Sequence, residues 1–268
     1  MKFKFLLITA LVLLALAMLS FPVRDLTADY RYRRIAVILD DEATEGRDVL
    51  PISEKTMPAY LEAIASLHDA AAIAPTRALY QGAIADLYTR LGKWAETMQF
   101  FKARLPAGAP TGRDAAGKTL FHLRRAVTLE PTNPDYHLAL GRLYDTDRGD
   151  PNLAAAELRK AVDAYPVNTP LRYSVAIQHL LSGRKGDALE QARLLAKLDD
   201  SYILRKPEYQ TDMIERQTPG YLSMLAGSYL YSALEIAWRV SKDPEVVKGI
   251  APDTPDATRV VQLFLASK

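Results

Sequence analysis

Two consecutive segments of the chain, 134–166 and 169–200, carry the same pattern of small and large apolar positions. They align residue by residue, with an offset of 35 positions at Gly141 and 34 at Ala154. The matched pairs are Leu140 with Val175, Gly141 with Ala176, Tyr144 with His179, Ala154 with Ala188 and Ala161 with Leu195. A period of this length is typical of stacked helix–turn–helix units, so it predicts an all-α fold built from repeats.

The pattern extends towards the N-terminus. Ala126 and Pro131 repeat the five-residue spacing of Ala161 and Pro166, and so do Ala70 and Pro75. Between Pro75 and Pro131 there are 56 residues, which is one repeat of 34 with 22 left over. We expect the extra length around 105–119, as a loop followed by an extra or extended helix.

The segment 78–101 reads as a further repeat in its own right. Ile84, Tyr88 and Gly92 occupy first-helix positions, and Thr97 takes the place of the small residue in the second helix. The segment would then form both helices of one unit, with Thr97 in the second helix.

These positions resemble the tetratricopeptide repeat family over roughly residues 55–200, about half of the chain. The resemblance implies a helical solenoid of about four helix–turn–helix units that binds protein partners on a concave face lined by the first helices. The expected partner-binding residues are Asp86, Arg90, Leu138, Arg142, Asp145, Tyr173, Ile177 and Leu181. The family's carboxylate-clamp pattern is absent, because Gly82 and Leu138 replace the residues it requires.

Flanking the repeats, we expect a linker helix and loop over 25–54 and a C-terminal helical cap over 201–268. Pro219 can open a long helix through Val240, and Asp243-Pro244 and Pro255 can start two shorter ones. The stretch Gln217–Leu234 contains no charge. A buried capping helix is the preferred interpretation, and a second membrane span is the alternative, although the segment is polar for one.

Residues 1–24 predict a membrane anchor. The run 5–23 has no charged residue and lies between Lys4 and Arg24, and its length just spans a bilayer core of about 30 Å as a helix. We expect a single-pass protein of the inner (cytoplasmic) membrane whose body lies outside the cytoplasm. The alternative is a secreted protein, with signal cleavage after Ala17.

Residues Gly112, Gly117, Lys118 and Thr119 match the phosphate-binding loop pattern G-x-x-x-x-G-K-[ST]. Such a loop follows a β-strand, yet Pro106 and Pro110 precede this match and prevent a strand there. We therefore interpret the match as coincidental, and a nucleotide-dependent enzyme that uses Gly112–Thr119 remains the alternative.

Charge and composition narrow the function further. Residues 1–24 hold three bases and no acid, so the remaining 244 residues hold 31 bases and 32 acids, which gives no reason to expect nucleic acid. With no Cys and four scattered His, the chain predicts no metal, no cofactor and no catalytic residue. We expect a non-enzymatic, membrane-anchored scaffold in a bacterial envelope complex, such as a polysaccharide-related one, and a self-assembling structural subunit is a further alternative.

Overall fold

A computed structural model of the chain describes residues 25–33, 52–53, 55–199 and 228–268. Within these ranges every regular element is a helix. The chain divides into two compact units, unit 1 up to Pro131 and unit 2 from Thr132 onward.

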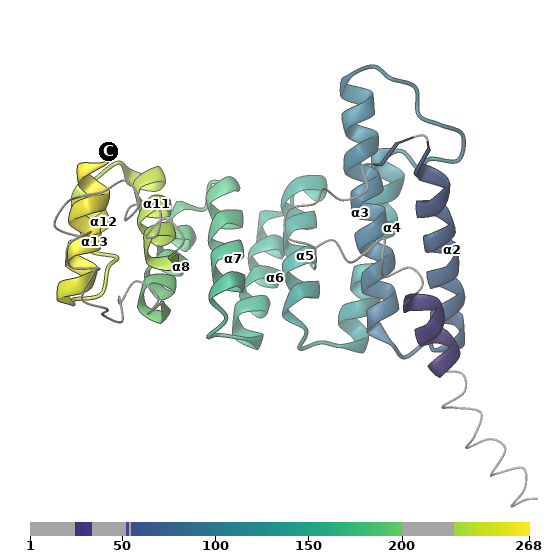
Figure 1. The fold of residues 1–268 in the computed structure, drawn as a ribbon, viewed down its shortest axis with the longest axis horizontal. Helices are drawn as coiled ribbons and strands as arrows, with labels where there is room; N and C mark the ends of the chain where they lie inside the picture. The colour runs from purple at the N-terminus through teal and green to yellow at the C-terminus, as the bar shows by residue number, and fades with distance from the viewer. Residues whose placement is uncertain (1–24, 34–51, 54, 200–227) are drawn as a thin grey trace, which may run out of the picture. The chain divides into compact units, whose positions relative to one another are not determined.

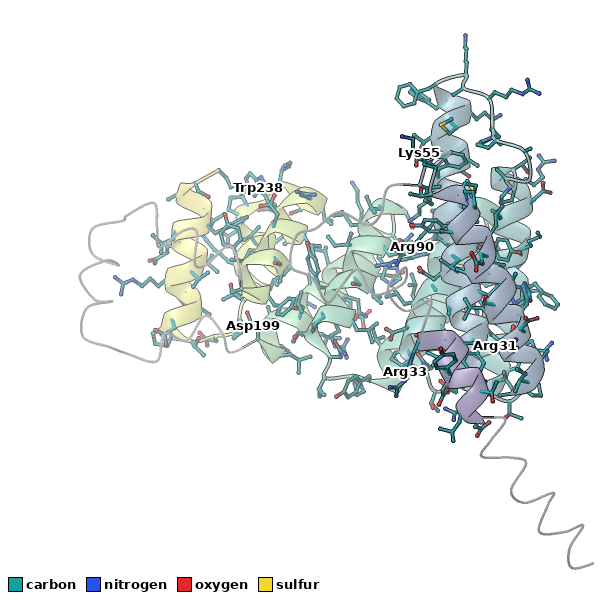
Figure 2. All side chains as sticks on the ribbon, turned by 45° about the vertical axis from the view of Figure 1, so that its right-hand side comes forward. Arg31, Arg33, Lys55, Arg90, Asp199 and Trp238 are labelled. Carbon is teal, nitrogen blue, oxygen red and sulfur yellow. The ribbon has the colours of Figure 1, made fainter. Side chains whose placement is uncertain are left out.

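Unit 1 contains three long helices, α2 (Met57–Ile73), α3 (Ala78–Phe100) and α4 (Gly112–Leu129). Helix α3 packs against both α2 and α4 (Figure 1). Residues 25–33 form a further helical segment that buries Ala28 in the same core. The Tyr80 hydroxyl donates to Asp29 at 2.7 Å, and Arg31, which is labelled in Figure 2, pairs with Asp69 of α2 at 2.9 Å. This segment therefore lies against α2 and α3.

The assignment of residues 78–101 to two helices of one repeat is wrong, because α3 continues through Thr97 as one helix of 23 residues to Phe100. Gly92 instead marks a close approach to α4: a Cβ there would lie 3.1 Å from the Cβ of Ala115. The second helix of this unit is therefore α4, with Ala115 at its small position. The extra 22 residues lengthen one hairpin, so the loop is confined to 101–111 and the helix begins at Gly112.

Unit 2 begins with two helical hairpins that match the two aligned segments of the sequence. Their elements are α5 (Pro134–Leu143), the π-helix η1 (Tyr144–Arg148), α6 (Pro151–Ala164), α7 (Thr169–Leu181) and α8 (Lys185–Leu198). Helix α5 packs on α6, α7 on α8, and α6 on α7. Each of the two aligned segments therefore corresponds to one helical hairpin.

Polar side chains set where these helices start. The side chain of the residue before each of α5, α6 and α7 accepts a hydrogen bond from a backbone amide of the first turn, at 2.9–3.1 Å. The pairs are Asn133 with the amide of Asp135, Asp150 with the amide of Leu153, and Asn168 with the amide of Leu171. These caps satisfy amides that have no partner within the helix, and a proline at the first or second helical position follows each cap.

Small residues bring the paired helices together, as the repeat pattern predicts. A Cβ at Gly141 of α5 would lie 2.7 Å from Cγ and Cδ2 of Leu158 in α6. Ala154, Leu158 and Ala161 are fully buried. The seam between α5 and α6 is therefore as tight as the side chains allow.

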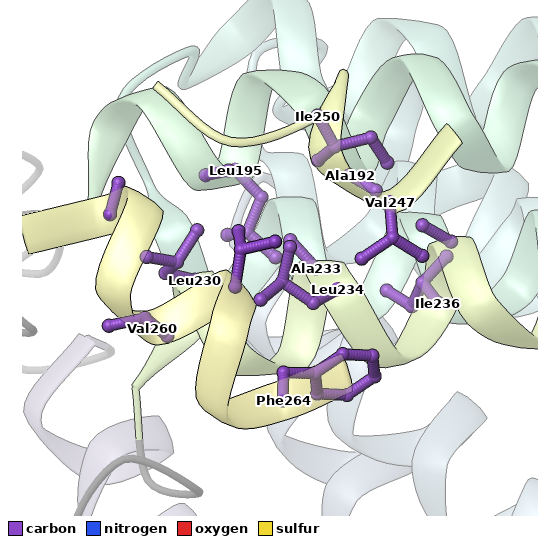
Figure 3. Close-up of a cluster of buried hydrophobic side chains, with 14 of the residues drawn as sticks. Ala192, Leu195, Leu230, Ala233, Leu234, Ile236, Val247, Ile250, Val260 and Phe264 are labelled. Carbon is purple, nitrogen blue, oxygen red and sulfur yellow. The ribbon is translucent and has the colours of Figure 1, made fainter. Parts of the chain in front are cut away.

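Three C-terminal helices close unit 2: α11 (Tyr229–Ser241), α12 (Pro244–Lys248) and α13 (Pro255–Ala266). Their apolar side chains form one cluster with α7 and α8, which includes Leu195, Leu234 and Phe264 (Figure 3). The predicted starts of α12 and α13 are confirmed. Asp256, Arg259 and Gln262 keep the outer side of α13 polar.

We expected one continuous helix from Pro219 through Val240, and this is wrong because the helix is not continuous at Ser228. Ser228 has an extended backbone and its hydroxyl accepts from the Tyr231 amide, so α11 starts afresh at Tyr229. Asp199, at the end of α8, accepts from the Leu230 amide at 2.7 Å and ties the two helices together. The rest of the uncharged stretch, 217–227, lies outside the described residues.

Among the residues that the structure describes, none of the helices combines the length and the apolar character needed to cross a bilayer. The predicted anchor, residues 5–23, lies outside the described ranges.

Candidate functional site

The expected partner-binding positions of unit 2 fall into different environments. Leu138 was expected to be exposed, which is wrong: it is 9% exposed and packs with Leu158 and Val175. Arg142 and Leu181 are exposed, and Leu181 leaves 76% of its surface in solvent.

Tyr173 and Ile177 are half-buried against the C-terminal cluster. The ring of Tyr173 lies 6.2 Å from that of Tyr229 in α11. Each of these two side chains is therefore partly buried by the cluster formed with α11–α13 and partly exposed to solvent.

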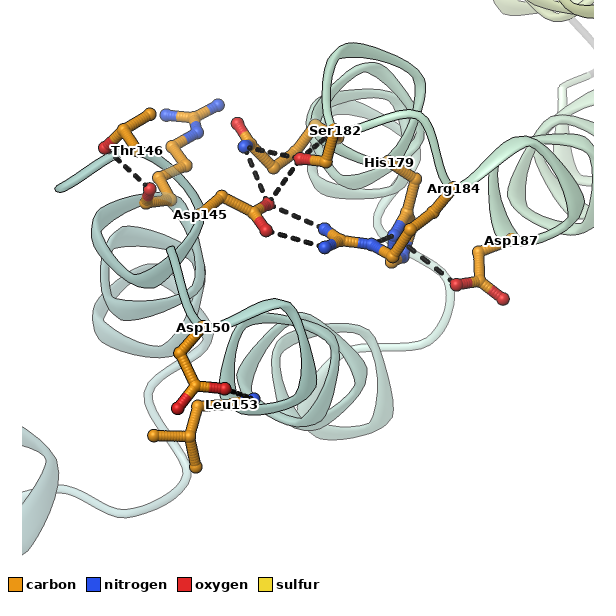
Figure 4. A network of polar contacts seen from close by, with 10 residues as sticks. Asp145, Thr146, Asp150, Leu153, His179, Ser182, Arg184 and Asp187 are labelled. Carbon is orange, nitrogen blue, oxygen red and sulfur yellow. Dashed lines mark hydrogen bonds and ion pairs between the residues drawn. The ribbon is translucent and has the colours of Figure 1, made fainter. Parts of the chain in front are cut away.

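Asp145 is also not available to a partner, because it is the centre of a polar network (Figure 4). Its carboxylate accepts two hydrogen bonds from Arg184 at 2.6 Å, one from the Ser182 hydroxyl at 2.6 Å and one from the Gln178 amide at 2.9 Å. Burial alone would raise the pKa of Asp145, but these hydrogen bonds and the Arg184 charge hold it below its usual value. The expected exposure of Asp145 is therefore wrong, and its role is to join η1 to the end of α7.

In unit 1, Asp86 and Arg90 of α3 bind each other one helical turn apart, with Arg90 Nε 2.7 Å from the carboxylate. Arg90 Nη1 is buried and finds no hydrogen-bond acceptor among the described residues. An intrahelical pair of this kind contributes only a few tenths of a kcal/mol, about 0.3–0.5.

The residues of the phosphate-loop pattern do not form a loop. Gly112–Thr119 makes up the first two turns of α4, and Thr111 caps that helix by accepting from the Asp114 amide. Thr119 is 1% exposed, and its hydroxyl faces the Ala85 carbonyl and the Thr89 hydroxyl at 3.5 and 3.4 Å. A buried hydroxyl in this position is turned away from any magnesium ion that a bound nucleotide would carry.

No group of three or more His, Cys, Asp or Glu within the described ranges is arranged to hold a metal ion.

The structure reveals a site that the repeat positions did not predict. A depression of about 510 Å³ runs between α2 and α4, with the Tyr88 side chain of α3 lining it, and we call it the α2–α4 groove. Its lining residues are Leu61, Tyr88, Gly108, Pro110, Arg113, Asp114, Gly117, Lys118 and Phe121.

The α2–α4 groove combines exposed aromatic surface with positive charge. Phe121 is 60% exposed, and Lys118 Nζ lies 4.8 Å from the centre of the Tyr88 ring. Within the part of the chain that the structure describes, neither Lys118 nor Arg113 forms an ion pair with a carboxylate. Asp114, the one acid in the groove, already accepts a hydrogen bond from Thr111 at 2.7 Å.

Beside the groove, His122 is buried and its Nδ1 donates to the Gln81 carbonyl oxygen at 2.8 Å. The ring of Phe121 stands edge-on to that of His122, with centres 5.0 Å apart. Burial, together with the nearby His68, Arg125 and Lys118, lowers the pKa of His122 to about 4. The imidazole is therefore neutral at pH 7, and it packs behind Phe121, which lines the groove.

The groove lies on the other side of α3 from the expected partner-binding face. Successive helical residues are about 100° apart, so Tyr88 points roughly 160–200° away from both Asp86 and Arg90. One sequence signal marks the region: residues 101–129 contain six bases and one acid in a body that is otherwise slightly acidic.

Comparison with known proteins gives structural neighbours only. No protein-family model matches the chain, and no curated protein matches it by sequence. Its fold is similar to the crystal structure of YrrB, described as a TPR protein with an unusual peptide-binding site, at 15% identity and a TM-score of 0.39, over 78% of this chain and 86% of that chain.

Two further crystal structures are similar at the same level. MamA matches at 15% identity and a TM-score of 0.40, over 79% of this chain and 94% of that chain. PilW, described as a widely conserved type IV pilus biogenesis factor, matches at 18% identity and a TM-score of 0.37, over 80% of this chain and 89% of that chain. The all-helical architecture of this chain follows from its own helices, α2 to α13.

Proposed function

We propose that this protein is a non-enzymatic scaffold of the tetratricopeptide type that holds protein partners together. The observation that carries the proposal is the use of the helix faces in unit 2. Small residues such as Gly141 and Ala154 complete the core between paired helices, while Leu181 remains exposed. Leu181 lies one and two helical turns from the half-buried Ile177 and Tyr173, so this face of α7 offers an apolar helix surface to a partner protein.

The proposal includes a membrane tether at residues 5–23. An uncharged run of this length behind two lysines favours a single-pass helix in the inner membrane, with the body outside the cytoplasm. Tethering raises the local concentration of any partner that the body binds, and this is the mechanism by which such a scaffold would assemble an envelope complex. A polysaccharide-related system is one such complex, and a secreted protein is the alternative localisation.

Two measurements test the tether and its orientation. We expect the full-length protein to stay in the membrane fraction after alkaline carbonate extraction, whereas a variant that starts at Asp25 should be released. We also expect a reporter enzyme that is active only outside the cytoplasm to be active when fused after Lys268. A silent but stably expressed fusion would contradict the orientation.

A third measurement tests the scaffold itself. Affinity purification of the full-length protein from gently solubilised membranes should recover defined partners in reproducible ratio. Size determination of the same preparation separates the self-assembling alternative, which predicts large homo-oligomers in the absence of other proteins. Recovery of only the protein itself as a monomer would overturn the scaffold proposal.

A further inference from the structure

We propose that the α2–α4 groove binds an acidic, extended segment of a partner protein. In this arrangement Arg113 and Lys118 bind carboxylates of the segment, and Phe121, Tyr88 and Leu61 contact one of its apolar side chains. The inference rests on the proposed function, because it assigns a partner chemistry to one surface of the scaffold.

The size and lining of the groove suit a short peptide. Its volume of about 510 Å³ falls in the range of roughly 300–1,000 Å³ that is usual for small-ligand sites. Gly117 and Gly108 contribute backbone without side chains, and a Cβ at Gly117 would meet no heavy atom within 4 Å. The groove is therefore open to a ligand at Gly117, and a larger side chain there would fill it.

The charges define the class of ligand. Arg113 and Lys118 line the groove, and Arg125 lies exposed on the same helix. Within the described ranges none of these three side chains forms an ion pair with a carboxylate. Burial is the main cause of the lowered pKa of His68, and the positive charge of Lys118 lowers it further. A surface whose cations have no carboxylate partner attracts anionic ligands.

The shape favours a peptide over a membrane or a nucleic acid. The side chain of Tyr88, at the base of the groove, belongs to a residue only 7% exposed, so a ligand has to enter between the helices to reach it. A bilayer surface cannot do so. Non-specific nucleic-acid binding relies on many phosphate contacts along a track, whereas this groove offers only two cations, among four apolar or aromatic side chains.

The test measures binding of a defined probe to full-length protein in a mild detergent. The probe is a fluorescently labelled ten-residue peptide of alternating Asp and Glu with one central Phe. Its binding is measured by fluorescence anisotropy. We expect saturable binding that weakens as salt increases. A matched peptide in which every Asp and Glu becomes Asn and Gln should bind at least tenfold more weakly.

Three variants locate the probe. Lys118→Gln and Gly117→Leu should each weaken binding at least tenfold, whereas Arg142→Gln, at an exposed position in unit 2, should leave it unchanged. Gly117→Leu is the decisive variant, because removing a glycine from a helix and adding a side chain in open space is expected to preserve or raise the melting temperature. A loss of binding in this variant would therefore show that the new side chain blocks the groove, and not that the protein has unfolded.

Other outcomes overturn the inference. Failure of the wild-type protein to bind the probe would do so, and so would binding that survives Gly117→Leu and Lys118→Gln. Tighter binding to phosphatidylglycerol vesicles or to single-stranded DNA, lost in the same variants, would assign the groove to that ligand instead. If membrane partners are still recovered while the probe fails, the scaffold stands and the groove assignment falls; if no partner is recovered at all, the proposed function itself fails.

Discussion

Arg184 donates to both carboxylate oxygens of Asp145, with Nη1 and Nη2 each 2.6 Å from the oxygen they contact. Asp145 lies in η1 and Arg184 directly precedes α8, so the pair connects two parts of unit 2 that are 39 residues apart in sequence. Both side chains are largely buried, at 6% and 14% exposure. This pair therefore holds neighbouring hairpins in register.

Replacing Asp145 with Asn should destabilise unit 2 by about 3–5 kcal/mol, because it leaves the buried guanidinium of Arg184 without a counter-charge. Urea denaturation followed by circular dichroism measures the change. Asp163→Asn, on the exposed side of α6, is the matched control and should change stability by less than about 0.5 kcal/mol. Equal effects of the two variants would show that the network has no structural role.

The same carboxylate predicts a loss of stability in acid. Hydrogen bonds hold the pKa of Asp145 below its usual value despite burial. Below about pH 4 the unfolded chain binds this proton more readily than the folded one, so the free energy of unfolding falls as the pH falls. The wild-type protein should therefore lose more stability than Asp145→Asn below that pH.

His122 predicts a second, higher window of pH dependence. Its pKa is lowered to about 4 in the fold, mainly by burial, against about 6.5 in an unfolded chain. Between those values the unfolded state takes up the proton first, so stability falls as the pH drops from about 6.5 towards 4.

In an NMR titration His122 should show a midpoint near 4, and a midpoint near 6.5 would contradict the buried environment. His122→Asn keeps a donor that can reach Gln81 without a titrating group. This variant should lose less stability than the wild type over the same pH window.

Gly141→Ala should cost about 1–3 kcal/mol, since its Cβ would lie 2.7 Å from two carbons of Leu158 and the fully buried leucine has little room to move. Gly186→Ala is the matched control, because a Cβ at this position in α8 meets nothing within 4 Å. The control should be neutral or slightly stabilising. Thermal unfolding compares the two, and a neutral Gly141→Ala would mean that the α5–α6 seam is looser than described.

The phosphate-loop pattern should have no activity. We expect equilibrium dialysis with radiolabelled ATP and magnesium to show no saturable binding, because Thr119 is buried and Gly112–Thr119 is helical. Saturable binding that disappears in Lys118→Ala would contradict this and restore the nucleotide-dependent alternative.

Local signals in the sequence predicted the hairpins of unit 2 well. The prediction rested on aligned small positions such as Gly141 and Ala154, which lie where α5 and α6 meet. The structure adds that Asn133 and Asn168 start α5 and α7 through hydrogen bonds that form within a few residues. Gly92 shows where local reasoning failed. A glycine that ends a helix and a glycine that lets another helix approach look the same in a sequence, and here Ala115, 23 residues away, decides between them.

The candidate site depends even more on distant residues. Leu138 and Asp145 occupy first-helix positions that the repeat pattern places on an open face, yet their neighbours in space bury both. The α2–α4 groove brings together residues from three helices that share no period. The basic composition of residues 101–129 is a sequence signal for this region, but it does not show which helices meet there.

The sequence by itself determined that the described chain folds as paired helices, because caps, prolines and small residues act through contacts within one helix or between consecutive ones. The tertiary structure decided which side chains are buried between the paired helices and which stay exposed to a partner. Exposure is a property of all the elements that meet at a point, so Phe121, Lys118 and Tyr88 became a site only once α2, α3 and α4 had packed together.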